Sequence, residues 1–339
     1  MDINNHRKSV HSLYIKILCI DLESHGIDYE ESLKAAHLPK DFMALGEGFV
    51  SIFQFQQMAD FARTRTGKKW LGLEIGQKIS TSHHGPLGYM MASSIDPETA
   101  INALVKYISL RSPLLGVKLE RNNNQACLRI QENVNINAIR DVFLESFFCV
   151  IINIIGIVYG KKLNISRLDL NYPKPDYHQH YQDFFQCPIY HNKPFSAVYF
   201  DVSVLKHKNL LSDSMAYRLA EVECEKLYLS LLSNDGLKSK IENIVLNPNA
   251  PFPTLEQTAH SLDISKSTFI RRLHKANTTY KEIVNSVRQE LSDYYLIETK
   301  LSVENIADKL GYEDTSNFSR VFKRWHNTTP TQYRVSHRK

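Results

Sequence analysis

Apolar and polar positions alternate most regularly between Leu255 and Arg334, where one pattern occurs twice along the chain. Each copy has a short helical stretch, a tight turn and a second helical stretch with an apolar inner face. The apolar positions of the first copy are Leu255, Ala259, Leu262, Phe269 and Leu273. Those of the second copy are Val303, Ile306, Ala307, Leu310, Phe318, Val321, Phe322 and Trp325. The pattern therefore predicts two helix-turn-helix units in tandem.

The two copies align with a single insertion. Ala259 matches Ala307 and Phe269 matches Phe318, so the second turn is one residue longer than the first. Between the copies, residues 280–299 have the spacing of a long helix that packs against both units. Upstream of the first copy, Thr254 and Gln257 form a capping box that marks where its first helix begins.

The pattern before the repeat is mixed. Helical spacing covers 9–66, 97–110 and 139–160, whereas 76–86 has the composition of a loop. Alternating strand patterns occur at 117–120, 126–131, 166–172 and 196–204. The composition of 121–125 predicts a hairpin turn that joins the first two strands, and 173–194 contains too many prolines for long regular structure. These elements predict an α+β domain of about two hundred residues.

One further helix is predicted at 212–232, before the repeat. Met215, Leu219 and Val222 lie on one side of it. An apolar stripe at this spacing is more often core packing than a dimer contact, so core packing is the favoured interpretation and a homodimer helix is the alternative.

Three segments follow from these patterns. Residues 1–232 are predicted to form an α+β domain, 233–253 a linker that three prolines interrupt, and 254–339 an all-α domain of two helix-turn-helix units joined by a long helix. A chain of 339 residues exceeds one ordinary core, which agrees with two domains.

The apolar segment 147–159 is the one candidate for a membrane helix. Its 13 residues fall short of the roughly 20 that a spanning helix needs, so we expect a buried core helix and no membrane association. Residues 1–8 are polar and no small-residue cleavage site follows, so no secretory signal is expected. The five cysteines are scattered, as is typical of free thiols in a reducing compartment, and we expect a cytoplasmic protein.

A helix-turn-helix unit leaves the outer face of its second helix free, and a major groove can admit that helix. The outer face of the first copy carries Lys266, Ser267, Thr268, Ile270, Arg271 and Arg272. That of the second copy carries Thr315, Ser316, Asn317, Ser319, Arg320, Lys323 and Arg324. We therefore expect these residues to contact double-stranded DNA, with the two units about one duplex turn, ~34 Å, apart.

The excess positive charge lies in the same region. Residues 237–339 hold 16 lysines and arginines against 11 acidic residues, whereas 1–236 hold 25 of each. Phosphate contact needs such an excess because each neutralised phosphate releases counterions. From charge alone, a solvated basic face is an equally good interpretation, and the repeat is what favours DNA.

The repeat region resembles the DNA-binding domain of the AraC/XylS family of bacterial transcription regulators. The residues that carry the resemblance are Ser-Val-Glu-Asn-Ile-Ala-Asp-Lys-Leu-Gly-Tyr (302–312), Asn-Phe-Ser-Arg-Val-Phe-Lys-Arg-Trp (317–325) and Pro-Thr-Gln-Tyr-Arg (330–334). Two positions depart from the family pattern. Asn327 stands where the family usually has glycine, and Asn tolerates a left-handed backbone. Ile270 stands where relatives often have a polar side chain, although it could contact a thymine methyl group.

The region before the repeat resembles the arabinose-binding-like regulatory domain of the same family over about 20–210. The resemblance rests on Gly-Pro-Leu-Gly-Tyr (85–89), the helix around 100–104 and the segment 181–189. It implies sensing of a small molecule, for example a fatty acid, or dimerisation. An enclosed apolar pocket with basic residues at its mouth would favour a fatty acid, whereas a solid core would favour dimerisation or protein contacts.

The resemblance as a whole implies a sequence-specific transcription regulator, with activation and contact with RNA polymerase expected. A ligand-independent regulator, whose first domain serves dimerisation or protein contacts, is the alternative. The rival chemistry is a metal site or enzyme built on His178, His180, Cys187 and His191. Their spacing matches no zinc pattern, and the sequence has no phosphate loop or nucleophile elbow. We therefore expect no metal, no cofactor and no enzymatic activity.

Overall fold

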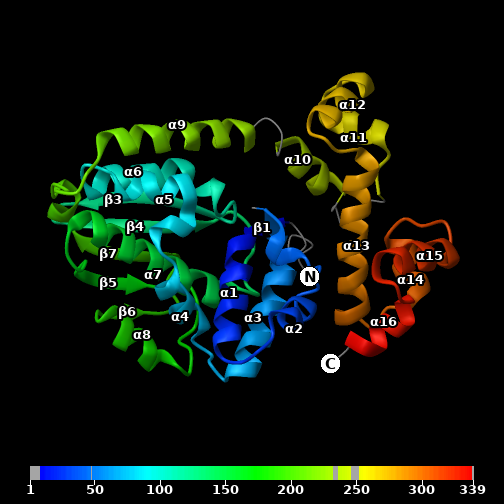
Figure 1. Cartoon of the computed structure of the whole chain (residues 1–339), viewed down its shortest axis with the longest axis horizontal. Coiled ribbons are helices and arrows are strands. Elements are labelled where there is room, and N and C mark those ends of the chain that lie inside the picture. Colours follow the sequence, from blue (N-terminus) through cyan, green and yellow to red (C-terminus); the bar gives the residue numbers. More distant parts are fainter. Residues whose placement is uncertain (1–7, 47, 232–235, 246–251, 338–339) are drawn as a thin grey trace. The chain divides into compact units, whose positions relative to one another are not determined.

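The computed structural model describes residues 8–46, 48–231, 236–245 and 252–337, which fall into two compact units (Figure 1). The N-terminal unit comprises Lys8–Leu229, and the C-terminal unit contains the described residues from Ser230 onward. Within the expected linker, 233–235 and 246–251 lie outside the described residues. The remainder includes helix α10 (Gly236–Val245).

Helix α10 is a structured part of what the sequence predicts as linker. Leu237, Ile241 and Val245 are spaced four residues apart and are buried in the core of the C-terminal unit. The prolines that suggested a linker all follow this helix, so they do not interrupt it.

A five-stranded sheet forms the centre of the N-terminal unit. Its strands are β3 (Leu115–Asn122), β4 (Gln125–Glu132), β5 (Ile165–Asp169), β6 (Ile189–Tyr190) and β7 (Ser196–Asp201), in the order β3-β4-β7-β5-β6. All neighbours are antiparallel except β5 and β6. Strands β3 and β4 form the expected hairpin, in which Asn123 has a positive φ of 45°. The α+β fold class is confirmed.

Helices cover this sheet and extend beside it. They are α1 (Ser12–Ser24), α2 (Tyr29–Ala35), α3 (Ile52–Thr66), α4 (Leu71–Lys78), α5 (Gly85–Ala92), α6 (Pro97–Tyr107), α7 (Arg140–Tyr159), α8 (His178–Phe185) and α9 (Ser214–Ser230). Two short strands, β1 (Lys8–His11) and β2 (Phe49–Ser51), pair beside α1 and α3. The sequence did not indicate this pair.

Helix α7 is the predicted core helix. Its length of 20 residues and its mean hydropathy of 2.2 would suffice for a membrane span, and it is the one described helix that passes this test. However, 72% of its apolar window is buried inside the unit. The expectation of a core helix is therefore confirmed.

The loop expected at 76–86 is shorter than predicted, because α4 extends to Lys78 and α5 begins at Gly85, which leaves only 79–84 and their short 3-10 turn between the helices. The serines, threonines and histidines of this segment gave it the composition of a loop. Gly72 and Gly76 of α4 lie where this helix meets α7, since a Cβ on Gly72 would stand 2.4 Å from the carbonyl oxygen of Val142. They permit close helix packing rather than a turn.

Core packing of the apolar stripe on α9 is wrong. Met215, Leu219 and Val222 are 67%, 66% and 68% exposed, whereas Ala220 and Cys224 on the opposite side are buried. The helix therefore packs on its small residues and presents its large apolar residues to solvent.

The C-terminal unit is entirely helical where it is described. After α10 come α11 (Leu255–Ser261), α12 (Lys266–Lys275), α13 (Tyr280–Glu298), α14 (Val303–Lys309), α15 (Thr315–His326) and α16 (Pro330–His337). The capping box at Thr254 and Gln257 is present. Ile283, Val287 and Leu291 of α13 are buried between the two helix pairs, so the predicted long central helix and the paired helix-turn-helix units are confirmed.

Candidate functional site

The two turns have the same construction. After α11 the chain passes through Asp263, with φ 54°, and the Ser265 side chain caps α12. After α14 it passes through Gly311, with φ 68°, and the Asp314 side chain caps α15. The extra residue of the second copy thus lies between the left-handed residue and the cap. The start of each second helix is fixed in the same way in both units.

Buried aromatic residues determine which face of each second helix points outward. Phe269 of α12 and Phe318 of α15 have no exposed surface. They pack in one hydrophobic cluster with Ala259 and Ala307 of the preceding helices. Because these residues occupy the inner faces of α12 and α15, the polar faces are left to solvent.

None of the thirteen residues expected to contact DNA is buried. The exposed ones are Lys266, Ser267, Arg271, Arg272, Ser316, Arg320, Lys323 and Arg324. The half-buried ones are Thr268, Ile270, Thr315, Asn317 and Ser319. The structure therefore gathers them on the outer faces of two helices.

Most of the cations on these faces form no ion pair within the described part of the chain. Lys266 forms an ion pair with Glu256 at 2.5 Å. The other cations form no ion pair with any residue that the structure describes; they are Arg271, Arg272, Arg320, Lys323 and Arg324. Five exposed positive charges are thus available to an anionic partner.

Arg288 holds the second unit to the central helix, and the sequence did not indicate this role. Its guanidinium donates to the carbonyl oxygen of Gly311 at 3.0 Å. It also lies over the rings of Phe252 and Tyr312, with 5.0 Å and 4.7 Å to the ring centroids. Helix α13 is thereby joined to the turn that precedes α15.

A second link joins α13 to the end of α15. His326 Nε2 lies 2.9 Å from a carboxylate oxygen of Asp293, and both side chains are largely buried. Burial raises the pKa of Asp293, while the neighbouring His326 acts in the opposite direction. One residue further, Asn327 ends α15 in the left-handed conformation with φ 54°, as its tolerance of that backbone predicted.

Comparison with known protein families identifies both units. Residues 26–209 match the arabinose-binding domain of AraC transcription regulators, N-terminal, and 258–336 match a helix-turn-helix domain. The chain belongs to the AraC family of transcription regulators. It is a transcription regulator with an N-terminal domain of the ligand-binding type, joined to a C-terminal helix-turn-helix domain.

Relatives of this AraC-family regulator cover most of its length. The ornithine utilization regulator of Pseudomonas aeruginosa is 28% identical over 321 residues, which is 95% of each chain. The regulator VqsM of the same organism is 26% identical over 273 residues, covering 78% of this chain and 83% of VqsM. The crystal structure of the regulator CdpR from Pseudomonas aeruginosa is 19% identical and aligns with a TM-score of 0.46 over 90% of this chain and 96% of CdpR.

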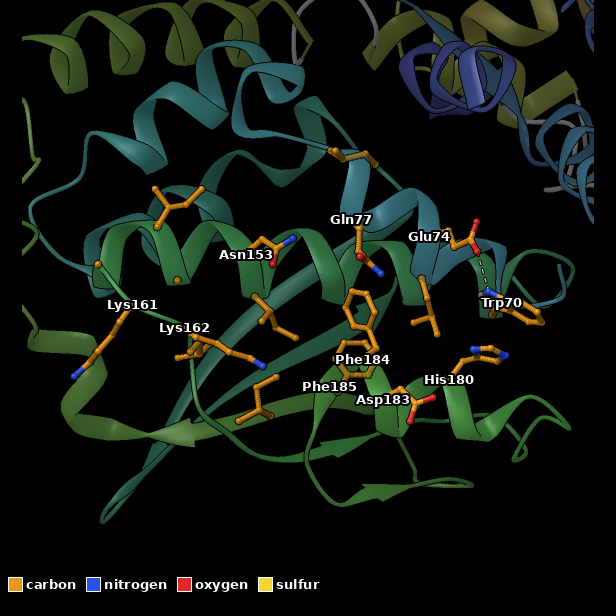
Figure 2. Close-up of a pocket in the computed structure, with 18 of the residues that line it drawn as sticks. Trp70, Glu74, Gln77, Asn153, Lys161, Lys162, His180, Asp183, Phe184 and Phe185 are labelled. Carbon is orange, nitrogen blue, oxygen red and sulfur yellow. Dashed lines mark hydrogen bonds between the residues drawn. The ribbon is translucent and has the colours of Figure 1, made fainter. Parts of the chain in front are cut away.

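The N-terminal unit of this AraC-family regulator contains an open cleft of about 1160 Å³ (Figure 2). Helices α4, α7 and α8 contribute to its walls, together with the segment that follows α7. Lys161 and Lys162 lie at one end. At the other end the rings of Trp70 and His180 stack with their centroids 3.7 Å apart.

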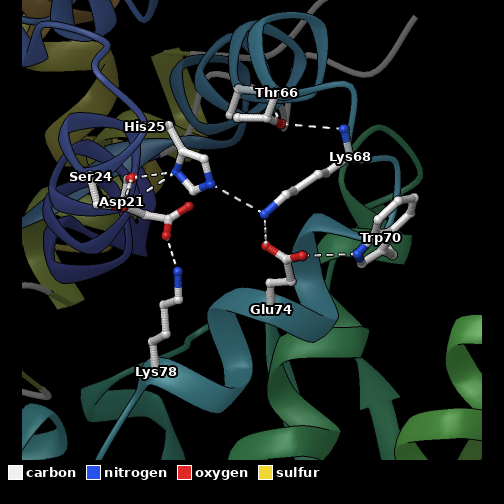
Figure 3. Close-up of polar contacts among 9 residues, drawn as sticks. Asp21, Ser24, His25, Thr66, Lys68, Trp70, Glu74 and Lys78 are labelled. Carbon is white, nitrogen blue, oxygen red and sulfur yellow. Dashed lines mark hydrogen bonds and ion pairs between the residues drawn. The ribbon is translucent and has the colours of Figure 1, made fainter.

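A network of polar contacts connects that aromatic end to helix α1 (Figure 3). Glu74 accepts a hydrogen bond from Trp70 Nε1 at 3.0 Å and forms an ion pair with Lys68 at 2.8 Å. Lys68 Nζ lies 3.2 Å from a ring nitrogen of His25, which follows α1. The position of Trp70 is therefore fixed by contacts that span three segments of the unit.

The same unit also has an enclosed apolar cavity between α5, α6 and α7. Arg111, His84 and Ser112 contribute its polar lining. Burial and the charge of Arg111 lower the pKa of His84 to about 3, so this imidazole is neutral. The free volume is only about 30 Å³, which is the space of roughly one water molecule.

The histidines considered as metal ligands do not converge on one point. The side chains of His178 and His191 lie 3.1 Å apart, ring nitrogen to ring nitrogen. His180, in contrast, stacks on Trp70 at the cleft. Within the described ranges, no group of three or more His, Cys, Asp or Glu side chains has the arrangement of a metal site.

Proposed function

We propose that this AraC-family regulator binds a specific duplex DNA sequence by placing α12 and α15 in two consecutive major-groove segments. The observation that carries the proposal is the pair of outward faces, on which five cations form no ion pair with a described residue. Arg271 and Arg320 each follow the buried aromatic of their helix by two positions, so they occupy equivalent places in the two units. We assign both arginines to base contacts and the remaining cations to the phosphates.

Footprinting on a selected operator tests this assignment. Arg271→Ala should weaken protection and sequence preference in one half of the operator, and Arg320→Ala in the other half, because each arginine belongs to a different unit. The two halves should lie about one helical turn, ~34 Å, apart. Loss of protection in the same half with both variants would contradict binding by two separate units.

We propose further that the protein activates transcription from its operator and contacts RNA polymerase. Among its relatives, the CfaD protein, the urease operon regulator and the PerA protein of Escherichia coli are named as activators. In vitro transcription with purified polymerase distinguishes activation from repression. Action on DNA also implies that the protein works in the cytoplasm.

We propose that the exposed stripe on α9 forms a homodimer contact. Met215, Leu219, Val222 and Leu229 follow one another at spacings of four, three and seven residues, which is the heptad spacing of a coiled-coil seam. They are 67%, 66%, 68% and 55% exposed, on the face opposite the buried Ala220 and Cys224. A second copy of α9 would cover them.

The mass of the protein in solution tests this contact. Leu219→Asp should convert a dimer into a monomer, as measured by analytical ultracentrifugation. Ile20→Asp is the matched control, because Ile20 is 59% exposed on α1 and lies away from the stripe. A dimer that survives Leu219→Asp unchanged would exclude α9 as the interface.

We also propose that the N-terminal unit senses a small molecule, and a fatty acid is the candidate that the family resemblance suggests. The large open cleft supports a sensor, whereas the enclosed cavity of about 30 Å³ has no room for an acyl chain. The alternative is a ligand-independent regulator, which the exposed α9 stripe favours. A change in operator affinity on adding effector separates the two, since a ligand-independent regulator would show none.

A further inference from the structure

We propose that the cleft between α4, α7 and α8 binds an elongated molecule that has an apolar body and a carboxylate head group, with Lys162 as the partner of the carboxylate. The inference rests on the proposed sensing role of the N-terminal unit and names its site and ligand chemistry. It is carried by the lining of the cleft and by the distribution of charge along it.

Apolar side chains form most of the cleft wall. They include Leu73, Ile152, Leu163, Ile165, Phe184 and Phe185. The volume of about 1160 Å³ exceeds the usual range for small-molecule sites, roughly 300 to 1,000 Å³, as expected of a cleft that is open to solvent. An extended ligand can therefore bury a long apolar surface here.

One end of the cleft carries the positive charge of Lys162, which has no acidic partner among the described residues. In Figure 2 the ammonium group of Lys162 points into the cleft, whereas that of Lys161 points away from it. Lys162 Nζ donates to the Gln186 side-chain oxygen at 2.6 Å and forms no ion pair with a described residue. An anionic group on a ligand would supply the missing countercharge, and a carboxylate accepts such a hydrogen bond.

The opposite end favours the tail of the ligand rather than a second anion. Asp183 lines this end and its negative charge repels an anion, whereas the charge of Glu74 is paired with Lys68. The stacked rings of Trp70 and His180 offer a flat surface there. The charge pattern therefore orients the ligand, with its carboxylate at Lys162 and its apolar end at Trp70.

Trp70 provides a direct assay because the chain has only two tryptophans. In a full-length protein that carries Trp325→Phe, Trp70 is the one fluorescent indole, and it lies in the cleft wall. Decanoate, dodecanoate and an aryl-alkyl carboxylate would be titrated against it, with decanol and decylamine as probes of the head group. Circular dichroism of each variant checks that the fold is retained.

The carboxylates should change the Trp70 emission and bind more tightly than decanol or decylamine. Lys162→Met, which keeps an unbranched apolar stem, should weaken carboxylate binding about three- to tenfold and leave decanol unaffected. Lys161→Met is the matched control and should bind like the parent protein. Asn153→Phe places a large side chain on an exposed position of the cleft wall and should abolish binding of carboxylate and alcohol alike.

Three results would overturn the site: no carboxylate in the series binds, decanol binds as tightly as decanoate, or Lys162→Met binds carboxylates with unchanged affinity. The regulatory role is measured separately, as the operator affinity of the protein with both native tryptophans, with and without the carboxylate that binds best. Binding at the cleft without any change in operator affinity would retain the site and reject the sensing function.

Discussion

Substitution of two neighbouring cations on α15 separates base reading from phosphate contact. Arg320 and Lys323 are both exposed, lie three positions apart on the same helix and form no ion pair with a described residue. Replacing either with alanine therefore breaks no ion pair or side-chain hydrogen bond with a described residue. Any effect on operator binding should come from the DNA side of the interface.

The two losses should differ in kind. Arg320→Ala removes a base contact and should cost about 1 to 3 kcal/mol on the operator, with relaxed preference at one base pair. Lys323→Ala removes one phosphate contact, which lowers the slope of log affinity against log salt by ~0.9. Between ~50 and ~200 mM salt, one such contact amounts to about a 3.5-fold change in affinity. The penalty for Lys323→Ala should therefore shrink by that factor at the higher salt.

Fluorescence anisotropy over a salt series measures both quantities. The operator, a variant with one base pair changed in the half that α15 reads, and a nonspecific duplex serve as ligands. Lys118→Ala is the control, because it removes the same charge from an exposed position on β3 in the other unit. The reasoning is refuted if Arg320→Ala weakens all three duplexes equally, or if Lys323→Ala leaves the salt slope at its original value.

Three further predictions concern stability. Burial raises the pKa of Glu145, which accepts hydrogen bonds from Tyr177 and Tyr181, from 4.5 to about 7. Because the pKa of Glu145 is higher in the folded than in the unfolded state, its contribution to the free energy of unfolding is fully present below pH 4.5, and about 3 kcal/mol is lost as the pH rises through 7. Glu145→Gln should abolish this loss in denaturant titrations at several pH values. A pH profile of stability that is the same in the variant and the parent protein would contradict this prediction. Asn327→Ala should lower stability by ~1 kcal/mol whereas Asn327→Gly should not, as measured by thermal unfolding, because the residue is left-handed. Arg288→Met should cost about 1 to 2 kcal/mol and speed hydrogen exchange around Gly311, because the guanidinium contact with that turn is lost; exchange at the native rate would exclude the link.

The C-terminal unit could be predicted from sequence because local signals determine it. Phe269 and Phe318 repeat at matching places, and Thr254 forms the capping box that its spacing to Gln257 indicated. Each signal lies within one or two turns of the residue it places. At Asn327, where the family usually has glycine, the left-handed backbone was predicted from the conformational preference of asparagine alone.

The errors arose where distant segments meet. The polar composition of 76–86 indicated a loop, although its first residues belong to α4, where Gly72 and Gly76 allow the backbone of α7 to approach. The stripe on α9 has the spacing of core residues, and spacing alone does not say whether the partner belongs to the same chain. Lys162 likewise had no sequence signal, because the cleft that it enters is formed by segments far apart along the chain.

The unbroken course of α13 constrains how this regulator can change its binding site. The helix runs from Tyr280 to Glu298 without interruption, and Arg288 and Asp293 connect it to the second helix-turn-helix unit. Adding or deleting one residue within it would turn one unit against the other by about 100° and shift it by ~1.5 Å. Replacement of side chains on α12 and α15 can therefore change which operator the protein binds. An operator with a different spacing between its halves would not fit the two units.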